Sequence, residues 1–319
     1  MIMAKSDEVR WEIIGTACVF NRPTTDQARK VKSTVVETMI SMKEELWGHI
    51  YNAFGQDHHL LGVYGTLLQV WTVFWIPNLL LMVVDVTGRP TALLRYKVQP
   101  DKNRPVSKSK LWTAVRVAIF NQVVVSLPFT LGLYYTMEWR GCGFHPHQLP
   151  TFCSTLLQLA FFVVIEEIGF YYSHRLLHQP TLYRHVHKLH HEWTAPVGVV
   201  AIYAHPVEHV VANLLPAVTG PVLLGSHLAV LWLWMTIVIV NTTVHHSGYH
   251  FPLLTSPQFH DFHHLKFNCC YGVLGILDSL HGTDKPFKSS KASLRHRPLL
   301  SLRPISQLIP DADSTEKSQ

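Results

Sequence analysis

Residues 60–84, LLGVYGTLLQVWTVFWIPNLLLMVV, form a run of 25 residues without a charged side chain. As a helix, this run would be about 37 Å long, which is enough to cross the roughly 30 Å hydrocarbon core of a bilayer with some tilt. The alternative is a buried helix in a large soluble core. Further runs of the same kind along the chain favour the membrane, so residues 60–84 are predicted to span it.

Three more apolar runs follow, at residues 117–135, 149–165 and 210–244. Pro128 predicts a kink in the first, and the second ends at Glu166 and Glu167. The third is too long for one span and is interrupted by glycine and proline at 220–221 and by Gly225. It is therefore interpreted as two short spans or a re-entrant hairpin.

The composition agrees with a membrane protein. Hydrophobic residues make up 48% of the 319 residues and charged residues only 15%, against about 25% in ordinary soluble domains. This excludes intrinsic disorder, collagen and coiled coil for most of the length, and also a highly charged nucleic-acid binder. The five cysteines contain no C-x-x-C pair, which disfavours a disulfide framework or a zinc ribbon.

Loop charges predict the orientation. Seven basic residues lie between the first two spans and place this loop in the cytosol: Arg89, Arg95, Lys97, Lys102, Arg104, Lys108 and Lys110. Because each span carries the chain to the other side of the membrane, the histidine-rich segments within residues 174–281 are predicted on the cytosolic side and the N-terminus in the lumen. The chain is divided into an N-terminal segment (1–58), a membrane hairpin with the basic loop (59–148), a catalytic domain (149–285) and a solvated tail (286–319).

Histidine is the most informative residue type. The 22 histidines outnumber the 21 carboxylates, and 16 of them lie between His174 and His281. They form an H-x-x-x-H box at 174–178 and H-x-x-H-H boxes at 187–191 and 260–264. Positions i, i+3 and i+4 share one helix face, so the imidazoles can converge on two metal ions. A solvated helix face would explain one such box, but not three.

His246 and His250, four residues apart, are expected to complete the ligand set, although Gly248 between them is able to break the helix. The predicted metal ligands are His174, His178, His187, His190, His191, His246, His250, His260, His263 and His264. Imidazole without cysteine suits iron, zinc, copper or nickel and argues against structural zinc. Glu166 and Asp278 are proposed partners of the ligands, and His205 is expected to line the pocket or to support a ligand.

Short sequence motifs in and around the boxes resemble those of a known protein family. They are His174-Arg-Leu-Leu-His178, His187-Lys-Leu-His-His-Glu192, Ala195-Pro196, Tyr203-Ala-His-Pro206, His246-Ser-Gly-Tyr249 and His260-Asp-Phe-His-His264. With them the chain resembles the fatty acid hydroxylase and sterol desaturase superfamily, and its sterol C-4 methyl oxidase branch in particular. The resemblance covers residues 150–285 well. His250 departs from it, because the branch commonly has Asp there.

The resemblance implies an all-α, multi-pass protein of the endoplasmic reticulum membrane with a histidine-rich helical cap on the cytosolic side. It implies two non-haem iron ions, dioxygen, and electrons from NAD(P)H through cytochrome b5 or its reductase. The substrate would be a lipid, with a 4-methyl sterol first and Tyr249 near its pocket. We also expect the basic loop to meet an acidic electron donor.

Three alternatives remain at this stage. A fatty acyl or sphingolipid hydroxylase, or a sterol desaturase, would use the same metal centre on another lipid. A catalytically silent membrane regulatory protein would keep the fold without turnover, but every residue of the three boxes is present. A metal transporter is a weaker option, because transporters place ionisable groups near the bilayer midplane rather than at the ends of spans.

Overall fold

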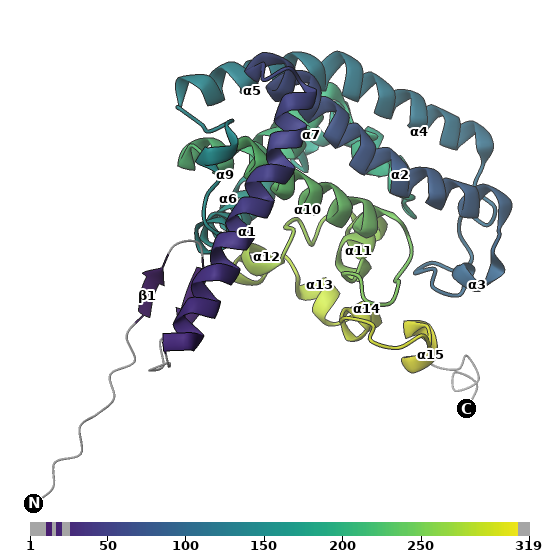
Figure 1. The fold of residues 1–319 in the computed structure, drawn as a ribbon. Coiled ribbons are helices and arrows are strands. Elements are labelled where there is room, and N and C mark those ends of the chain that lie inside the picture. Colours follow the sequence, from purple (N-terminus) through teal and green to yellow (C-terminus); the bar gives the residue numbers. More distant parts are fainter. Residues whose placement is uncertain (1–10, 15–16, 21–25, 312–319) are drawn as a thin grey trace, which may run out of the picture.

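A computed structural model describes residues 11–14, 17–20 and 26–311, and thus only parts of the predicted segments 1–58 and 286–319. Strands β1 (Trp11–Ile14) and β2 (Ala17–Phe20) pair antiparallel and precede α1 (Asp26–Ala53). The rest of the described chain is built from helices and loops (Figure 1). Apart from this short hairpin, the all-α prediction is confirmed.

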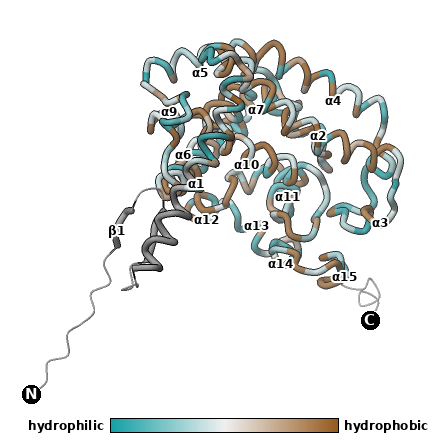
Figure 2. The backbone as a smooth tube through the Cα atoms, viewed as in Figure 1, coloured by the Kyte–Doolittle hydropathy of each residue, from teal (hydrophilic) through white to brown (hydrophobic). Residues whose placement is uncertain are grey.

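Five helical segments are long and apolar enough to cross a membrane: Leu60–Thr87, Lys108–Trp139, Phe152–Leu177, Pro206–Leu224 and Leu228–His246. The predicted spans are thus confirmed, and residues 210–244 divide into two helices as expected. Large apolar side chains such as Leu80 and Leu157 are 67% and 72% exposed. Hydrophobic residues run along α2, α4 and α10 in Figure 2. In lipid, such side chains face a solvent that suits them.

The spanning segments contain π-helical turns at three places. The first spanning segment consists of η1 (Leu60–Gly65), which is a π-helix, and α2 (Thr66–Thr87). The second spanning segment consists of α4 (Lys108–Phe120), the π-helix η2 (Asn121–Val125) and α5 (Ser126–Trp139). The third is α6 (Phe152–Leu177). The fourth consists of α8 (Pro206–Glu208), η6 (His209–Leu214) and α9 (Leu215–Leu224), and the last is α10 (Leu228–His246). Such π-turns frequently mark functional sites.

Small residues let α6 and α9 approach closely. A Cβ on Gly220 would lie 2.9 Å from Cδ1 of Phe162, and a Cβ on Gly169 would lie 3.1 Å from Cβ of Pro216. Close backbone approach at small residues is the usual way in which helices pack in membranes. This contact fixes the axis of α6, whose last turn carries His174.

The histidine boxes do not all lie on α-helices. The first is at the end of α6 and the third is on α11 (Gln258–Lys266), but the second forms a 3-10 helix, η4 (His187–Glu192). Helix α6 also continues past Glu166 and Glu167, at which its apolar run ends. Backbone amides satisfy the carboxylate of Glu167, so this charge does not end the helix.

Short elements surround the spans: α3 (Thr91–Leu94), η3 (Pro146–Gln148), α7 (Pro180–His185), η5 (Gly198–Ile202), α12 (Ile276–His281), α13 (Lys285–Lys288), α14 (Lys291–Arg295) and α15 (Ile305–Leu308). Helices α13 and α14 lie near α11 in Figure 1, and α14 packs against it. Phe287 packs on Phe259 and Phe262, and Leu299 is buried. Most residues of 286–311 are exposed, as expected of a solvated tail, but a few apolar side chains fasten this segment to the protein.

The basic loop is fastened to the bundle by a buried ion pair. Nζ of Lys97 lies 3.2 Å from Oδ1 of Asp85, and the Tyr249 hydroxyl donates to the same oxygen at 2.7 Å. Lys97 also donates to the carbonyl of Asn103 at 2.8 Å. The other six basic residues of the loop are exposed. Lys97 is thus structural and not part of the basic surface.

Replacing Lys97 by Met should lower the free energy of unfolding by about 3 kcal/mol, because it leaves the Asp85 carboxylate buried without its cation. The Asp85→Asn/Lys97→Met double variant should recover most of this loss, since the neutral amide introduced at position 85 still accepts from Tyr249. Thermal unfolding in mild detergent measures both. Equal melting temperatures for wild type and the Lys97→Met variant would contradict this role.

Candidate metal centre

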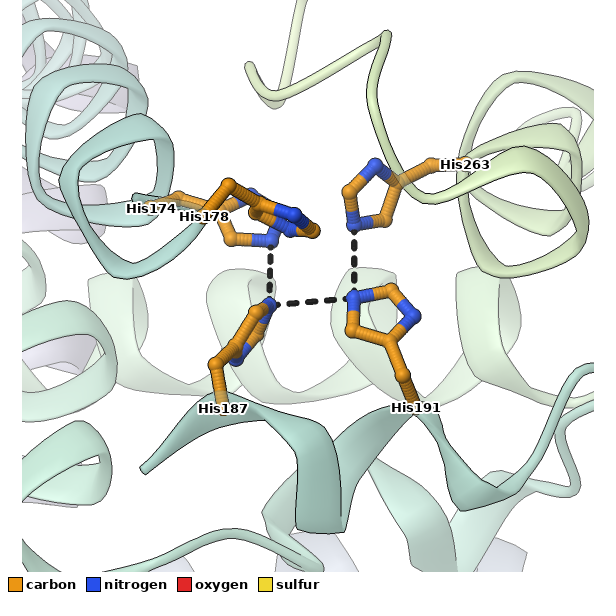
Figure 3. Close-up of side chains that lie close together, drawn as sticks. All are labelled: His174, His178, His187, His191 and His263. Atoms are coloured by element: carbon orange, nitrogen blue, oxygen red, sulfur yellow. Dashed lines mark hydrogen bonds between the residues drawn. The ribbon is translucent and has the colours of Figure 1, made fainter. Parts of the chain in front are cut away.

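Nine histidines meet in two adjacent groups. The first contains His174, His178, His187, His191 and His263, and the second contains His190, His246, His260 and His264. Within each group, one ring nitrogen of every residue lies within 4.8 Å of the others. Figure 3 shows the first group, with rings from α6, η4 and α11 pointing toward a common centre. All nine side chains are buried except the half-buried His178.

Each H-x-x-H-H box contributes to both groups. His187 and His191 of the second box enter the first group, and His190 enters the second. In the third box His263 enters the first group, whereas His260 and His264 enter the second. The last turn of α10 adds His246. Because each of these two H-x-x-H-H boxes supplies residues to both groups, neither box can move without disturbing both, and the separation of the groups is fixed.

Backbone carbonyls fix the protonation of most of these rings. Five Nδ1 atoms donate to carbonyl oxygens: His174 to Tyr271 (2.8 Å), His190 to Tyr203 (3.2 Å), His246 to Thr242 (2.9 Å), His263 to Cys269 (2.7 Å) and His264 to Trp193 (3.0 Å). A carbonyl can only accept, so Nδ1 must carry the proton. In a neutral imidazole the other nitrogen, Nε2, then presents a bare lone pair.

The rings are held neutral. Burial, and then the neighbouring imidazoles, lower the pKa of His187, His260, His263 and His264 well below the usual value. For His190, burial followed by the charge of a neighbouring histidine lowers the pKa to about 4. A second proton is therefore not available at neutral pH to relieve the crowding of these nitrogens.

The bare Nε2 atoms nevertheless lie close together. Nε2 of His263 is 3.1 Å from Nε2 of His191, and Nε2 of His246 is 3.4 Å from Nε2 of His190, where both rings carry their proton on Nδ1. The first contact is one of the dashed lines in Figure 3. Converging lone pairs repel unless a cation lies between them. The donor set, nitrogen without cysteine or carboxylate, suits a transition-metal ion of the iron-to-zinc series. The residues present thus fit a metal ion in each group.

Buried carboxylates support the groups from outside. Oε1 of Glu208 lies 2.9 Å from Nδ1 of His187, within ion-pair distance, although the ring N–H is not aligned for a hydrogen bond. Asp278 accepts from the amides of Tyr271 and Gly272 at 2.8 and 2.7 Å. It therefore shapes the loop whose Tyr271 carbonyl orients His174. The placement of Asp278 agrees with its predicted supporting role.

Sequence reasoning missed two carboxylates. Glu167, next to the predicted Glu166, accepts four backbone amides between residues 273 and 277 and anchors the same loop. Glu208 was also missed, although a carboxylate at the edge of an apolar run was the signal that had selected Glu166. Glu166 itself borders the cavity below the metal centre, which agrees with a pocket role.

Three predicted residues lie elsewhere. His250 is in neither group, because Gly248 adopts φ +74° and ends α10, and the His250 ring then turns to the carbonyl of Arg297 at 3.1 Å. His205 caps α8 by accepting from the amide of Val207 and does not border the cavity. Tyr249 belongs to the Asp85–Lys97 ion pair. The expected roles of these three side chains at the site are therefore corrected.

A cavity connects the centre with the interior of the bundle. Its metal-side wall contains His174, His187, His190, His246 and His260. Away from them it is bordered by apolar side chains of α2, α9 and α10, including Val70, Phe74, Ala217, Met235 and Val238. A cavity that is polar at one end and apolar along its length suits an amphiphilic lipid.

The basic loop is hydrogen-bonded to segments that carry the histidine boxes. Gln99 donates to the carbonyl of Thr194 at 2.9 Å and to Oδ2 of Asp261 at 3.0 Å. Asp261 lies inside the third box, and burial raises its pKa to about 7. Asn103 donates to the carbonyl of Ala195 at 2.6 Å. The loop is therefore hydrogen-bonded to Asp261 of the third box and to residues 194–195, which follow the second box.

Comparison with known proteins agrees with this geometry. Residues 159–283 match the fatty acid hydroxylase family. Over 266 residues the chain is 50% identical to fatty acid hydroxylase domain-containing protein 2 of Macaca fascicularis, covering 83% of this chain and 80% of the relative. Methylsterol monooxygenase 2-2 of Arabidopsis thaliana is 32% identical, with 79% and 96% covered.

Very-long-chain aldehyde decarbonylase GL1-8 of Oryza sativa subsp. indica is 34% identical, with 78% of this chain and 94% of the relative covered. No solved structure matches the chain. The names of these relatives point to oxidative chemistry on lipids, in agreement with a histidine centre at the end of an apolar cavity. The chain belongs to the fatty acid hydroxylase family.

Proposed function

We propose that the chain is a membrane-bound oxygenase that holds two iron ions and oxidises a C–H bond of a lipid, with a 4-methyl sterol as the first candidate. The observation that carries the proposal is the convergence of unprotonated Nε2 atoms in two buried groups at the end of an apolar cavity. The fatty acid hydroxylase and the methylsterol monooxygenase among the relatives support the same reaction class.

The nine histidines of the two groups would hold the ions. Iron supplies redox chemistry with dioxygen, which an unactivated C–H bond requires and acid–base groups alone do not provide. The protein orients the lipid in the cavity and keeps water away from its reacting end. Placing the centre at the ends of α6 and α10 lets a lipid enter sideways from the bilayer. We assign the histidine end to the cytosolic face of the endoplasmic reticulum, as the basic loop suggests.

Metal content should follow the two groups. Wild-type protein purified anaerobically should contain two iron ions per chain. His191→Ala in the first group and His264→Ala in the second should each lose about one, because removing one ligand weakens one site. His250→Gln is the matched control and should retain both. Elemental analysis of the full chain measures this, and equal losses in all three variants would contradict the assignment.

The reaction is tested in lipid bilayers with ¹⁸O₂ and a chemical reductant. The full chain should transfer one ¹⁸O atom to a 4-methyl sterol, and His263→Ala should lower the rate at least about 100-fold because it removes a proposed ligand. His250→Gln should retain turnover. Mass spectrometry of the extracted sterols is the readout. Unlabelled sterol with intact iron sites would exclude this substrate.

Lipid profiles of cells that lack the protein distinguish the remaining alternatives. Accumulated 4-methyl sterols support the sterol substrate. Unchanged sterols with a loss of 2-hydroxylated lipids support the acyl hydroxylase, which is favoured by the 38% identity to fatty acid hydroxylase ahd1 of Mycosarcoma maydis. A phenotype that the His263→Ala variant fully complements would instead favour the regulatory protein without turnover.

The basic loop is the proposed docking surface for an acidic electron donor such as cytochrome b5. Lys102, Arg104 and Lys108 are exposed, and Gln99 ties their loop to the second and third boxes. Opposite charges raise the association rate at low ionic strength and lose this effect in salt.

Replacing Lys102, Arg104 and Lys108 by Gln should slow reduction by cytochrome b5 about 10-fold at low ionic strength, with the difference vanishing in high salt. Neutralising the exposed Lys285 and Arg297 of the C-terminal segment is the control and should have little effect. Stopped-flow absorbance follows the donor. An unchanged rate in the loop variant would rule out this surface.

A further inference from the structure

Glu208 is a buried carboxylate with one unused oxygen. Its side chain is 3% exposed and lies where α8 passes into the π-helix η6. Oε1 lies beside Nδ1 of His187, whereas Oε2 is buried and has no hydrogen-bond partner among the described residues. A buried carboxylate oxygen without a donor is costly, so a native protein normally provides one.

The missing donor has to come from the cavity, because Glu208 borders it together with His187. Several other polar side chains of the wall already have partners in the protein, and Glu166, which has none among the described residues, is only half-buried. The Ser126 hydroxyl lies 3.0 Å from Nε2 of His209, and Trp75 donates to Oε1 of Gln122 at 2.7 Å. Thr243 also has an unpartnered hydroxyl, but a hydroxyl both donates and accepts and therefore selects less. Among the described residues of the wall, Glu208 is the fully buried carboxylate that is left with an open acceptor atom.

We propose that Glu208 is a specificity-determining residue that accepts a hydrogen bond from a hydroxyl or N–H group of the lipid. Only the imidazole of His187 separates its carboxylate from the first histidine group. The donor group of the lipid is thereby held next to the metal centre, and a C–H bond one or two atoms away is the one presented for reaction. The identification of that carbon rests on the proposed oxygenase function.

This assignment divides lipids by chemistry. A sterol with a 4-methyl group has its hydroxyl on the adjacent ring carbon, and an N-acyl sphingoid lipid has an amide N–H close to its second acyl carbon. Both provide the donor. A fatty aldehyde or an unsubstituted alkyl chain has no donor, so it leaves Oε2 unpaired and is disfavoured. Rejection through an unpaired buried polar group is stronger than rejection by size.

Binding is measured with the zinc-loaded full chain in lipid nanodiscs, because zinc occupies histidine sites without redox turnover. The probes are a 4,4-dimethyl sterol and its 3-methyl ether, and a ceramide and its analogue with O- and N-methyl caps. Wild type should bind the donor-bearing member of at least one pair about 10-fold more tightly, equivalent to about 1.4 kcal/mol. Glu208→Gln should reduce this ratio to about two while retaining affinity for the capped member.

Asn241→Ala is the control, because Asn241 borders the same cavity and its amide oxygen already accepts from the Thr255 hydroxyl. It should keep the wild-type preference for the donor-bearing member. Glu208→Asp, which keeps the carboxylate, should bind the donor-bearing member better than Glu208→Gln does. Equal zinc content in all variants verifies that the histidine groups are intact.

Two results would overturn the proposal. One is an unchanged ratio in Glu208→Gln, as expected if Oε2 holds only water. The other is a wild-type ratio near one for both probe pairs. The oxygenase proposal fails separately: a chain that discriminates the probes but does not oxidise lipid with iron bound would keep the role of Glu208 in binding and lose only the reaction.

Discussion

The metal centre depends on five imidazole Nδ1–H groups, each of which donates to a backbone carbonyl. That pairing decides which nitrogen is left bare, and the geometry directs the bare nitrogens toward two centres. Neutral rings whose bare nitrogens face each other, such as His190 and His246 at 3.4 Å, are stable only around a cation. The same carbonyls are supplied by loops, so the loops have to be held rigidly for the centre to exist.

The carboxylates of α6 and α12 provide this rigidity. Glu167 and Asp278 together accept six backbone amides of residues 271–277, which fixes the Tyr271 carbonyl against His174. On the other side, Gln99 and Asn103 fasten the loops that follow the second box. The buried pair of Lys97 and Asp85 then ties this loop to α2. A site that is held from both sides is preorganised for its ligand.

Much of this could be predicted from the sequence. Long uncharged runs are decisive for spans, and boxes of histidines at i, i+3 and i+4 are decisive for a metal site. The division of the two H-x-x-H-H boxes between the two histidine groups was not predictable. For the second box it depends on whether residues 187–192 form a 3-10 helix or an α-helix. Carbonyl partners such as those of Tyr271 and Cys269 leave no trace in side-chain patterns.

Other differences have local causes. Glu166 and Glu167 are adjacent and chemically identical, but they lie on different faces of α6. Glu166 therefore borders the cavity, whereas Glu167 binds the loop. His246 and His250 have the spacing of neighbours on one helix face, but Gly248 between them adopts a left-handed conformation and ends the helix. A side chain does not fit there, because its Cβ would lie 2.8 Å from the carbonyl oxygen of Pro196. The tail packs through Phe287, Leu299 and Ile305, whereas the basic and polar residues between them suggested solvent.

The most direct test of the central claim is iron K-edge X-ray absorption on the iron-loaded full chain. The account predicts a first coordination shell dominated by imidazole nitrogen, with a second iron as a heavier scatterer beyond it and no sulfur. A single iron without a neighbouring metal, or a shell containing sulfur, would contradict two histidine-bound ions and the arrangement derived from the bare Nε2 atoms.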